Sequence, residues 1–212
     1  MQTIRKPFAT YDFYHVFQPI WHFPTNRALG YEALLRSKSN IGPDRLFSEA
    51  ARQGRLFEMD TMSALWAATG FFSTECASEN DELLFVNLFP STLTAEAFPE
   101  FVESLLEACS GAAHRIVFEI NESLAEGEVW NTGAFRKNYA YLQQFGFSIA
   151  LDDVGEGTAN LKKMVEFSPQ FVKMDRFFSK QLVTSKKKQK IIEFFVSFCE
   201  DESSLVLEGI EE

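Results

Sequence analysis

The stretch FSIALDDVGEGTANLKKMVEF, residues 147–167, holds one complete strand-to-helix unit and decides the fold class. The apolar run FSIAL predicts a buried strand, and TANLKKM begins an amphipathic helix. Two adjacent acids, Asp152 and Asp153, stand where the strand ends. Neighbouring carboxylates repel each other unless water or a cation screens them, so the pair requires an explanation.

Two explanations for the acidic pair stay open at this point. An ordinary turn is one, because Asp and Gly are common turn residues. Divalent cations held by the acids are the other, and such cations would attract phosphate. A bare phosphate-binding glycine loop is excluded, since Asn160 replaces the third glycine of G-x-G-x-x-G and two acids precede the turn.

Composition and charge narrow the class of protein. The chain has 212 residues, 46% hydrophobic and 24% charged, which suits one large globular α/β domain. No run approaches the ~18 apolar residues of a membrane span, and the polar N-terminus is unlike a signal peptide, so we expect a cytoplasmic chain without a membrane span. The formal net charge of −10 argues against a polymeric nucleic acid as partner. Cys76, Cys109 and Cys199 lack any C-x-x-C spacing, which argues against disulfides and zinc.

The basic run SKKKQK, residues 185–190, opens the amphipathic segment IIEFFVSFCE. We interpret it as a solvated helix end rather than a binding patch. His15, His22 and His114 have no metal-type spacing and are weak catalytic candidates.

Short apolar runs alternate with amphipathic helical stretches along the chain, which is typical of a parallel α/β sheet. The first two runs, HVFQPIWH and LGYEALLR, are separated only by FPTNRA. A parallel crossover needs a dozen or more residues, so this pair predicts an antiparallel hairpin. Further strands are expected at LLFVNL, RIVFEI, FSIALDD, FVKMD and SLVLEGIE. Because no Pro/Gly/Ser-rich linker interrupts the pattern, we predict a single barrel-like domain over residues 1–212.

Polar residues fall at or near the C-terminal ends of these strands. They are Glu32, Arg36, Asn87, Glu119, Asp152, Asp153, Lys173, Asp175 and Glu208. In a (β/α)₈ barrel these strand ends converge on one face, where active sites lie. Each residue alone has a local explanation: Glu32 could pair with Arg36, Asn87 could cap the turn before Pro90, and Lys173 could neutralise Asp175. Their repetition on consecutive strands favours one shared site.

The residue types indicate a metal-dependent reaction on a phosphodiester. Glu32, Asn87, Glu119 and Asp152 offer four oxygen ligands, and Asp153 can reach a second ion. All-oxygen coordination suits Mg²⁺ or Mn²⁺. Two such ions ~3.5–4 Å apart would activate water for an in-line displacement. Lys173 could orient that water, and Arg36 could hold a phosphate.

Seven ordered motifs resemble the EAL family of cyclic-di-GMP phosphodiesterases. They are FQPIW, GYEALLR, FVNL, FEINE, LDDVGEG, VKMD and LEGIE, and they cover about residues 17–211. The resemblance implies a TIM-like (β/α)₈ barrel with one antiparallel strand. It also implies hydrolysis of the bacterial second messenger cyclic di-GMP to linear pGpG with two Mg²⁺ or Mn²⁺ ions, by a homodimer.

The same resemblance implies roles for individual residues. Metal ligands are Glu32, Asn87, Glu119, Asp152 and Asp153. Catalytic residues are Lys173, which positions water, Glu208, which holds a metal-bound water, and Glu32. Substrate contacts are Gln18, Leu34, Arg36, Asp60 and Asp175. Glu122 anchors the loop that follows the paired aspartates.

Two departures from the family pattern stand out. Val154 and Glu156 replace the Phe and Thr of the family's D-D-F-G-T-G loop, which links the metal site to the dimer interface. The sequence stops at Glu212, where the family continues with a helix and a last strand carrying a glutamine, so we expect a barrel without its eighth strand. These departures keep an alternative open: a weak or inactive EAL-like module that binds cyclic di-GMP or a protein partner.

Overall fold

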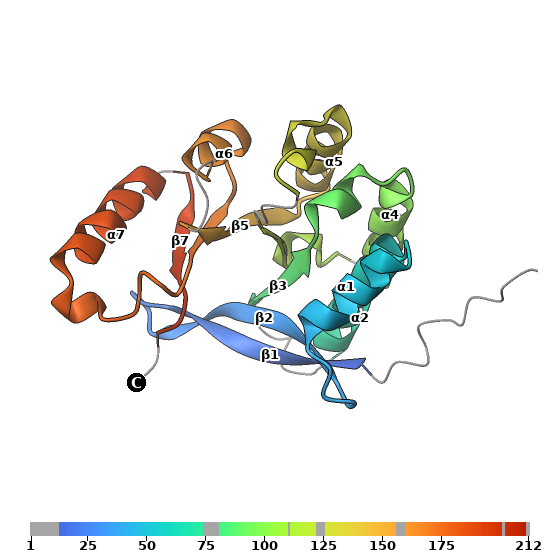
Figure 1. Cartoon of the computed structure of the whole chain (residues 1–212), viewed down its shortest axis with the longest axis horizontal. Coiled ribbons are helices and arrows are strands. Elements are labelled where there is room, and N and C mark those ends of the chain that lie inside the picture. Colours follow the sequence, from blue (N-terminus) through green and yellow to red (C-terminus); the bar gives the residue numbers. More distant parts are fainter. Residues whose placement is uncertain are drawn as a thin grey trace, which may run out of the picture. The chain divides into compact units, whose positions relative to one another are not determined.

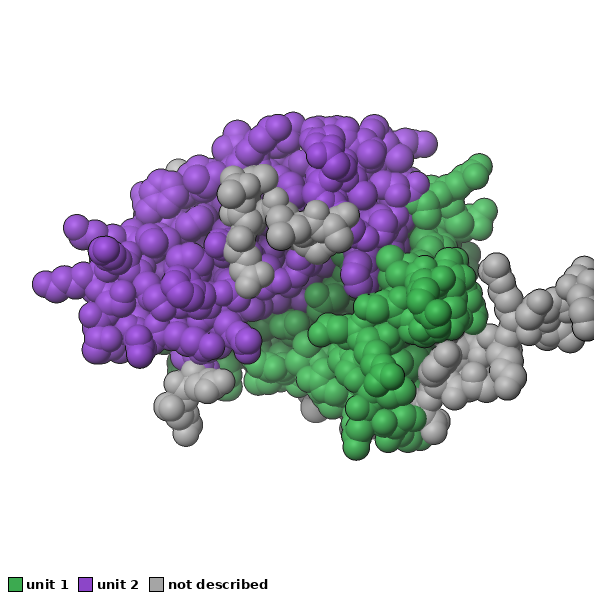
Figure 2. Space-filling view, viewed as in Figure 1, with its two compact units in different colours: residues 1–88, 95–116 green, residues 89–94, 117–212 purple. Residues whose placement is uncertain are grey.

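The structure is a computed structural model that describes residues 13–73, 81–109, 111–121, 126–155, 160–200 and 202–210 (Figure 1). The chain divides into two compact units, which Figure 2 colours separately. The first unit comprises residues 1–88 and 95–116, and the second comprises residues 89–94 and 117–212. Strands alternate with helices in each unit, as the sequence predicts.

The first unit begins with the predicted hairpin. Strand β1 (Phe13–His22) pairs antiparallel with β2 (Arg27–Ser37), and Gln18 lies opposite Glu32. Strand β3 runs parallel to β2. The other elements of this unit are α1 (Pro43–Arg52), α2 (Leu56–Phe72), β3 (Leu83–Leu88), α4 (Phe98–Ala108) and the short η3 (Ala113–Arg115).

Gly30 is required where β2 meets β3. A Cβ atom at this position would lie 2.3 Å from the carbonyl oxygen of Leu83, closer than real Cβ contacts come. The hairpin packs through Leu35 against buried Leu46, Ala50 and Met59 of the two helices that follow it. Close backbone approach on one side and apolar packing on the other therefore fix β2 in the first unit.

The second unit contains parallel strands in chain order, each preceded by helical segments. Parallel pairing joins β4 to β5, β5 to β6, and β6 to β7. The strands are β4 (Ile116–Asn121), β5 (Ser148–Val154), β6 (Phe171–Met174) and β7 (Ser204–Leu207). The helices are α5 (Gly133–Gln144), α6 (Asn160–Phe167) and α7 (Lys186–Cys199), with the short η2 (Pro90–Thr94), η5 (Val129–Asn131) and η6 (Leu182–Thr184).

The basic run of residues 185–190 begins a helix, as expected. Ser185 is the N-cap of α7, and its side chain accepts a hydrogen bond from the backbone N–H of Lys188. The Lys188 ammonium donates to the carbonyl oxygens of Phe177 and, at 2.7 Å, of Lys180. One lysine of the run therefore ties the helix to the preceding turn.

Within the described ranges, β7 is the last strand. The described helices include none that is long and apolar enough to cross a membrane.

Candidate active site

A buried lysine is the centre of the site in the second unit. Lys173 lies on β6 and is only 1% exposed. Its ammonium nitrogen lies 2.6 Å from Glu119 Oε1, 2.8 Å from Glu208 Oε1 and 3.3 Å from Asp152 Oδ1. These acids come from β4, from the residue after β7, and from β5. A buried ammonium is tolerated only with counter-charges, so the strand-end residues form one electrostatic unit.

The local explanation that Lys173 neutralises Asp175 is wrong. The ion pairs of Lys173 join it to Glu119, Asp152 and Glu208 instead. Strand β6 ends at Met174, and Asp175 Oδ1 accepts the backbone N–H of Phe177 at 2.8 Å. Asp175 therefore closes the turn after β6.

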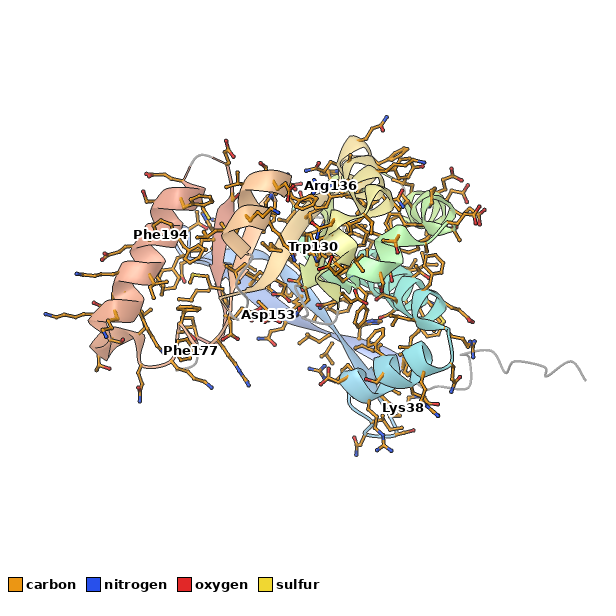
Figure 3. The ribbon with its side chains drawn as sticks, turned by 45° about the horizontal axis from the view of Figure 1, so that its top comes forward. Lys38, Trp130, Arg136, Asp153, Phe177 and Phe194 are labelled. Atoms are coloured by element: carbon orange, nitrogen blue, oxygen red, sulfur yellow. The ribbon has the colours of Figure 1, made fainter. Side chains whose placement is uncertain are left out.

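A β-bulge explains how two adjacent aspartates serve one site. In a regular strand, successive side chains point to opposite faces. Between Leu151 and Val154, however, β5 has one residue more than the facing part of β6, so Asp152 and Asp153 both lie opposite Lys173. Asp153 has a left-handed backbone with φ of 53°. The bulge thus re-aims Asp153, which is labelled in Figure 3.

Three carboxylates gather at this bulge. Asp152, Asp153 and Glu208 each place one oxygen within 4.8 Å of the others. The side-chain amide of Asn121, at the end of β4, donates a hydrogen bond to Asp153 Oδ2. Sequence reasoning missed Asn121, although it follows Glu119 by two residues and so belongs to the same face of the strand. Asn121 holds the re-aimed aspartate in place.

Glycines with positive φ allow the segment after β6 to pack against this site. Gly155, two residues after Asp153, has φ of 116°, and a Cβ there would lie 2.2 Å from Cε2 of Phe178. Gly209, directly after Glu208, has φ of 66°, and its carbonyl oxygen accepts a hydrogen bond from Ser179 Oγ at 3.1 Å. The residues that follow Asp153 and Glu208 are therefore held close to the segment after β6.

The donor set fits a divalent cation. Among the described residues, Lys173 forms ion pairs with Glu119, Asp152 and Glu208, and Asp153 lies with Asp152 and Glu208 in the group of three carboxylates. These four carboxylates outnumber the ammonium of Lys173. Glu119 is fully buried beside Lys173, whereas Glu208 is 27% exposed. Asp152, Asp153 and Glu208 thus form the side open to an ion, and hard cations prefer such oxygen ligands.

Most of the other predicted site residues lie in the first unit. Asn87 Nδ2 lies 3.5 Å from Glu32 Oε1, a long contact between β3 and β2. Arg36 donates to the carbonyl oxygen of Leu35 at 2.9 Å. Asp60 is buried in α2, at 1% exposure. Gln18 and Leu34 lie on β1 and β2. Glu122 and Glu156 lie outside the described residues.

Comparison with protein families identifies the chain: the model of the EAL domain matches residues 1–212. The chain belongs to the EAL domain family. A relative named "Probable cyclic di-GMP phosphodiesterase PdeI", from Escherichia coli (strain K12), is 28% identical over 184 residues, which are 84% of this EAL domain and 23% of the relative. Another, the "Blue light- and temperature-regulated antirepressor BluF" of the same strain, is 25% identical over 90% of the EAL domain and 46% of its own length. The chain spans about a quarter of the length of the first curated relatives it matches.

Solved structures show the fold of this EAL domain. Klebsiella pneumoniae BlrP1, in a complex with manganese and cyclic di-GMP at pH 6, matches with a TM-score of 0.81 and 26% identity. The match covers 94% of this chain and 50% of that one. A complex of the same protein with calcium and cyclic di-GMP gives a TM-score of 0.80 and 27% identity. The predicted fold class, a TIM-like alternating β/α arrangement with one antiparallel strand, is confirmed.

Proposed function

We propose that this EAL domain hydrolyses cyclic di-GMP to linear pGpG with Mg²⁺ or Mn²⁺. The observation that carries the proposal is the cluster around Lys173, where Asp152, Asp153 and Glu208 gather three carboxylate oxygens within 4.8 Å. Relatives named as cyclic di-GMP phosphodiesterases and the manganese complex of BlrP1 support it. The second messenger is a phosphodiester, which matches the chemistry that such a cluster can promote.

Each residue of the cluster has a distinct task in this mechanism. Asp152, Asp153 and Glu208 would hold the cation, with Asn121 fixing the orientation of Asp153. When bound, the cation supplies an acidified water and offsets charge on the phosphate. The Lys173 ammonium, fixed by Glu119 at 2.6 Å, would orient the attacking water and offset the developing negative charge through its own positive charge. Because Lys173 is buried, its field acts with little screening by solvent.

The other predicted site residues stay predictions within this proposal. Glu32 and Asn87 are predicted ligands, and Glu32 is also predicted to be catalytic. Gln18, Leu34, Arg36, Asp60 and Asp175 are predicted substrate contacts, and Glu122 is the predicted loop anchor. A cytoplasmic homodimer belongs to the same proposal. Leu161 and Val165, one helical turn apart on α6 and 45% and 69% exposed, support a second copy as partner.

The decisive experiment incubates the purified chain with cyclic di-GMP and Mn²⁺ and measures pGpG by anion-exchange chromatography. We expect product with Mn²⁺ or Mg²⁺ and none after chelation. Asp153→Asn with Glu208→Gln should abolish turnover. Glu103→Gln, an exposed glutamate on α4, is the matched control and should keep full activity. Metal-independent turnover, or full activity in the double variant, would contradict the proposal.

A binding module without turnover is the second candidate. The relative BluF is named an antirepressor rather than a phosphodiesterase, and Val154 replaces the family's Phe beside the paired aspartates. Calorimetric titration with cyclic di-GMP separates the two candidates. Saturable binding without pGpG in the presence of Mn²⁺ would favour the module over the enzyme.

A further inference from the structure

A strongly basic segment, residues 176–192, lies between β6 and the middle of α7. It contains six basic residues and no acid, in a chain whose net charge is −10. Five of the six are exposed, and they are Arg176, Lys180, Lys186, Lys187 and Lys190. None of them has a task in the hydrolysis proposed above. The basic segment is therefore a candidate surface for a partner of opposite charge.

Hydrogen bonds within the basic segment fix its backbone. The Lys188 ammonium donates to the carbonyl oxygen of Phe177, and its Nζ also lies 4.1 Å from the centroid of the Phe177 ring. The side-chain amide of Gln189 donates to the carbonyl oxygens of Leu182 at 2.9 Å and Val183 at 3.1 Å. Two consecutive residues of α7 thus hold the turns that precede the helix. The exposed side chains of these turns are therefore presented by an ordered backbone.

Apolar side chains protrude among the charges of these turns. Val183 of η6 is 91% exposed, and Phe177 is 60% exposed. Gln181, directly before η6, has a left-handed backbone with φ of 56°, so the chain turns sharply just before Val183. A valine and a phenylalanine this exposed contribute little to the core of the fold. They are available to an apolar environment outside it.

The same combination of charge and apolar surface continues along α7. Lys187, Ile191 and Phe194 are exposed and follow one another at intervals of four and three residues, which places them on one side of the helix. Phe198 is 42% exposed, and its ring lies 6.1 Å from that of Phe194, which Figure 3 labels. Exposed lysines beside exposed aromatic and aliphatic side chains are typical of segments that lie at a membrane surface.

We propose that the basic segment docks on a membrane surface that contains anionic phospholipids. The exposed lysines contact the lipid phosphates, and Val183 and Phe177 enter the boundary between headgroups and acyl chains. Lysine suits this position because its aliphatic stem lies along apolar surface while its ammonium stays in water. The docking is independent of the cluster around Lys173, so it can exist whether or not the chain hydrolyses cyclic di-GMP.

The arrangement favours lipid over a folded protein partner. The core of a protein interface is depleted of charge, whereas the apolar side chains of the basic segment are interleaved with cations. An anionic bilayer is negative over its whole surface, so the cations need no matching groups at defined positions. The sequence alone favours a solvated helix end for residues 185–190, because it does not show that Phe177 and Val183 stay exposed before that helix.

Vesicle co-sedimentation tests the proposal with the purified chain. Vesicles of phosphatidylcholine alone are compared with vesicles of phosphatidylcholine mixed with phosphatidylglycerol. We expect the chain to sediment with the mixed vesicles and to stay in solution with the neutral ones. It should leave the mixed vesicles at ~1 M NaCl, where the Debye length falls to ~3 Å.

Charge variants identify the surface that binds. Lys187→Gln with Lys190→Gln should weaken binding to the mixed vesicles roughly tenfold or more, because two lysines near an anionic surface are lost. Lys137→Gln with Lys162→Gln, at exposed positions on α5 and α6, is the matched control. It changes the net charge equally and should bind as the unmodified chain does.

A fluorescence measurement tests whether the tip of the turn enters the bilayer. The emission of Val183→Trp should be quenched by anionic vesicles with brominated acyl chains, above the quenching of the native tryptophans. Phe145→Trp, at an exposed position at the end of α5, is the control and should add no quenching.

Three results would overturn the proposal. They are no sedimentation with the mixed vesicles, an equal loss of binding in the control pair, and binding to polyglutamate without binding to vesicles, which would assign the surface to an acidic protein. If a variant does not fold, the salt-dependent sedimentation of the unmodified chain still decides the matter. The vesicle assay contains no cyclic di-GMP, so its failure is distinct from any failure of the phosphodiesterase assay.

Discussion

The two units carry the predicted site residues in different ways. In the second unit, one buried ammonium holds three acids, from β4, from the residue after β7 and from β5, at 2.6, 2.8 and 3.3 Å. In the first unit, Asn87 Nδ2 lies 3.5 Å from Glu32 Oε1, and Arg36 donates to a backbone carbonyl oxygen. The second unit therefore holds its acids by the charge of a buried lysine, whereas these contacts of the first unit are hydrogen bonds. Substitutions, metal addition and changes of pH should therefore affect stability and activity differently in the two units.

The largest effect is expected from Lys173→Met. It leaves the buried Glu119 and its neighbouring acids without their shared cation, which should destabilise the chain by about 3–5 kcal/mol. Glu32→Gln in the first unit should cost less than ~1 kcal/mol. Urea unfolding measures both. The double variant Lys173→Met with Glu119→Gln should recover part of the stability but no activity, and equal losses in the two single variants would remove the contrast.

Metal addition should act through the acids of the second unit. At an ion concentration ~100 times its Kd, Mn²⁺ should stabilise the chain by about 2.7 kcal/mol and raise the Tm by several degrees. Asp152→Asn with Glu208→Gln should abolish this rise. An undiminished rise in the variant would show that the ion binds elsewhere.

A kinetic contrast between the units follows from the proposed roles. Arg36→Ala should raise KM for cyclic di-GMP roughly tenfold or more with little change in kcat, the result of losing a charged contact to phosphate. Lys173→Arg keeps the buried charge and should chiefly lower kcat, since the water-orienting geometry changes. Steady-state kinetics with Mn²⁺ measures both. Parallel changes of KM and kcat in the two variants would contradict the division of tasks.

Glycine substitutions compare how the units tolerate crowding. Gly30→Ala forces a Cβ to within 2.3 Å of a backbone oxygen on β3, whereas Gly155→Ala meets the ring of Phe178 at 2.2 Å. A ring can shift and a paired strand cannot, but the φ of 116° strains alanine at position 155 as well. We expect losses of about 1–3 kcal/mol, larger for Gly30→Ala. Gly70→Ala in α2 meets nothing within 4 Å and should stabilise the chain by ~0.5–1 kcal/mol.

The smallest effect is a pH dependence in the first unit. Burial lowers the pKa of His15 from 6.5 to about 4, and His15 Nε2 lies 3.1 Å from Ser63 Oγ. The unfolded chain therefore binds the proton first, so the stability is complete above pH 6.5 and is lost as the pH falls towards 4. We expect a loss of about 1 kcal/mol between pH 7 and pH 5.5. His15→Gln should flatten this part of the unfolding curve, and an unchanged pH profile would exclude His15 as its source.

Local patterns in the sequence predicted the fold well. A six-residue connection was enough to predict the β1–β2 hairpin, and acids at strand ends predicted that distant residues of the second unit meet. The partners of Lys173 could not be predicted in the same way. Asp175 is two residues from Lys173 in sequence, yet β6 ends between them, and the real partners come from other strands whose register no local pattern encodes.

The acidic pair was recognised from the sequence, but its geometry was not. Adjacent residues of a strand should face opposite ways, so the pattern alone cannot bring Asp152 and Asp153 to one site. The bulge and the φ of 53° at Asp153 do so, and both depend on pairing with β6. Asn121 was missed because its partner, Asp153, becomes reachable only after that bend.

The bulge in β5 makes the site depend on a residue count as well as on residue types. Deleting one residue between Leu151 and Val154 would remove the bulge and let β5 pair with β6 in a regular register. A single aspartate would then remain opposite Lys173. Insertions and deletions in this short segment are therefore more damaging to the site than most substitutions, and a gap placed here in any sequence alignment would conceal the loss.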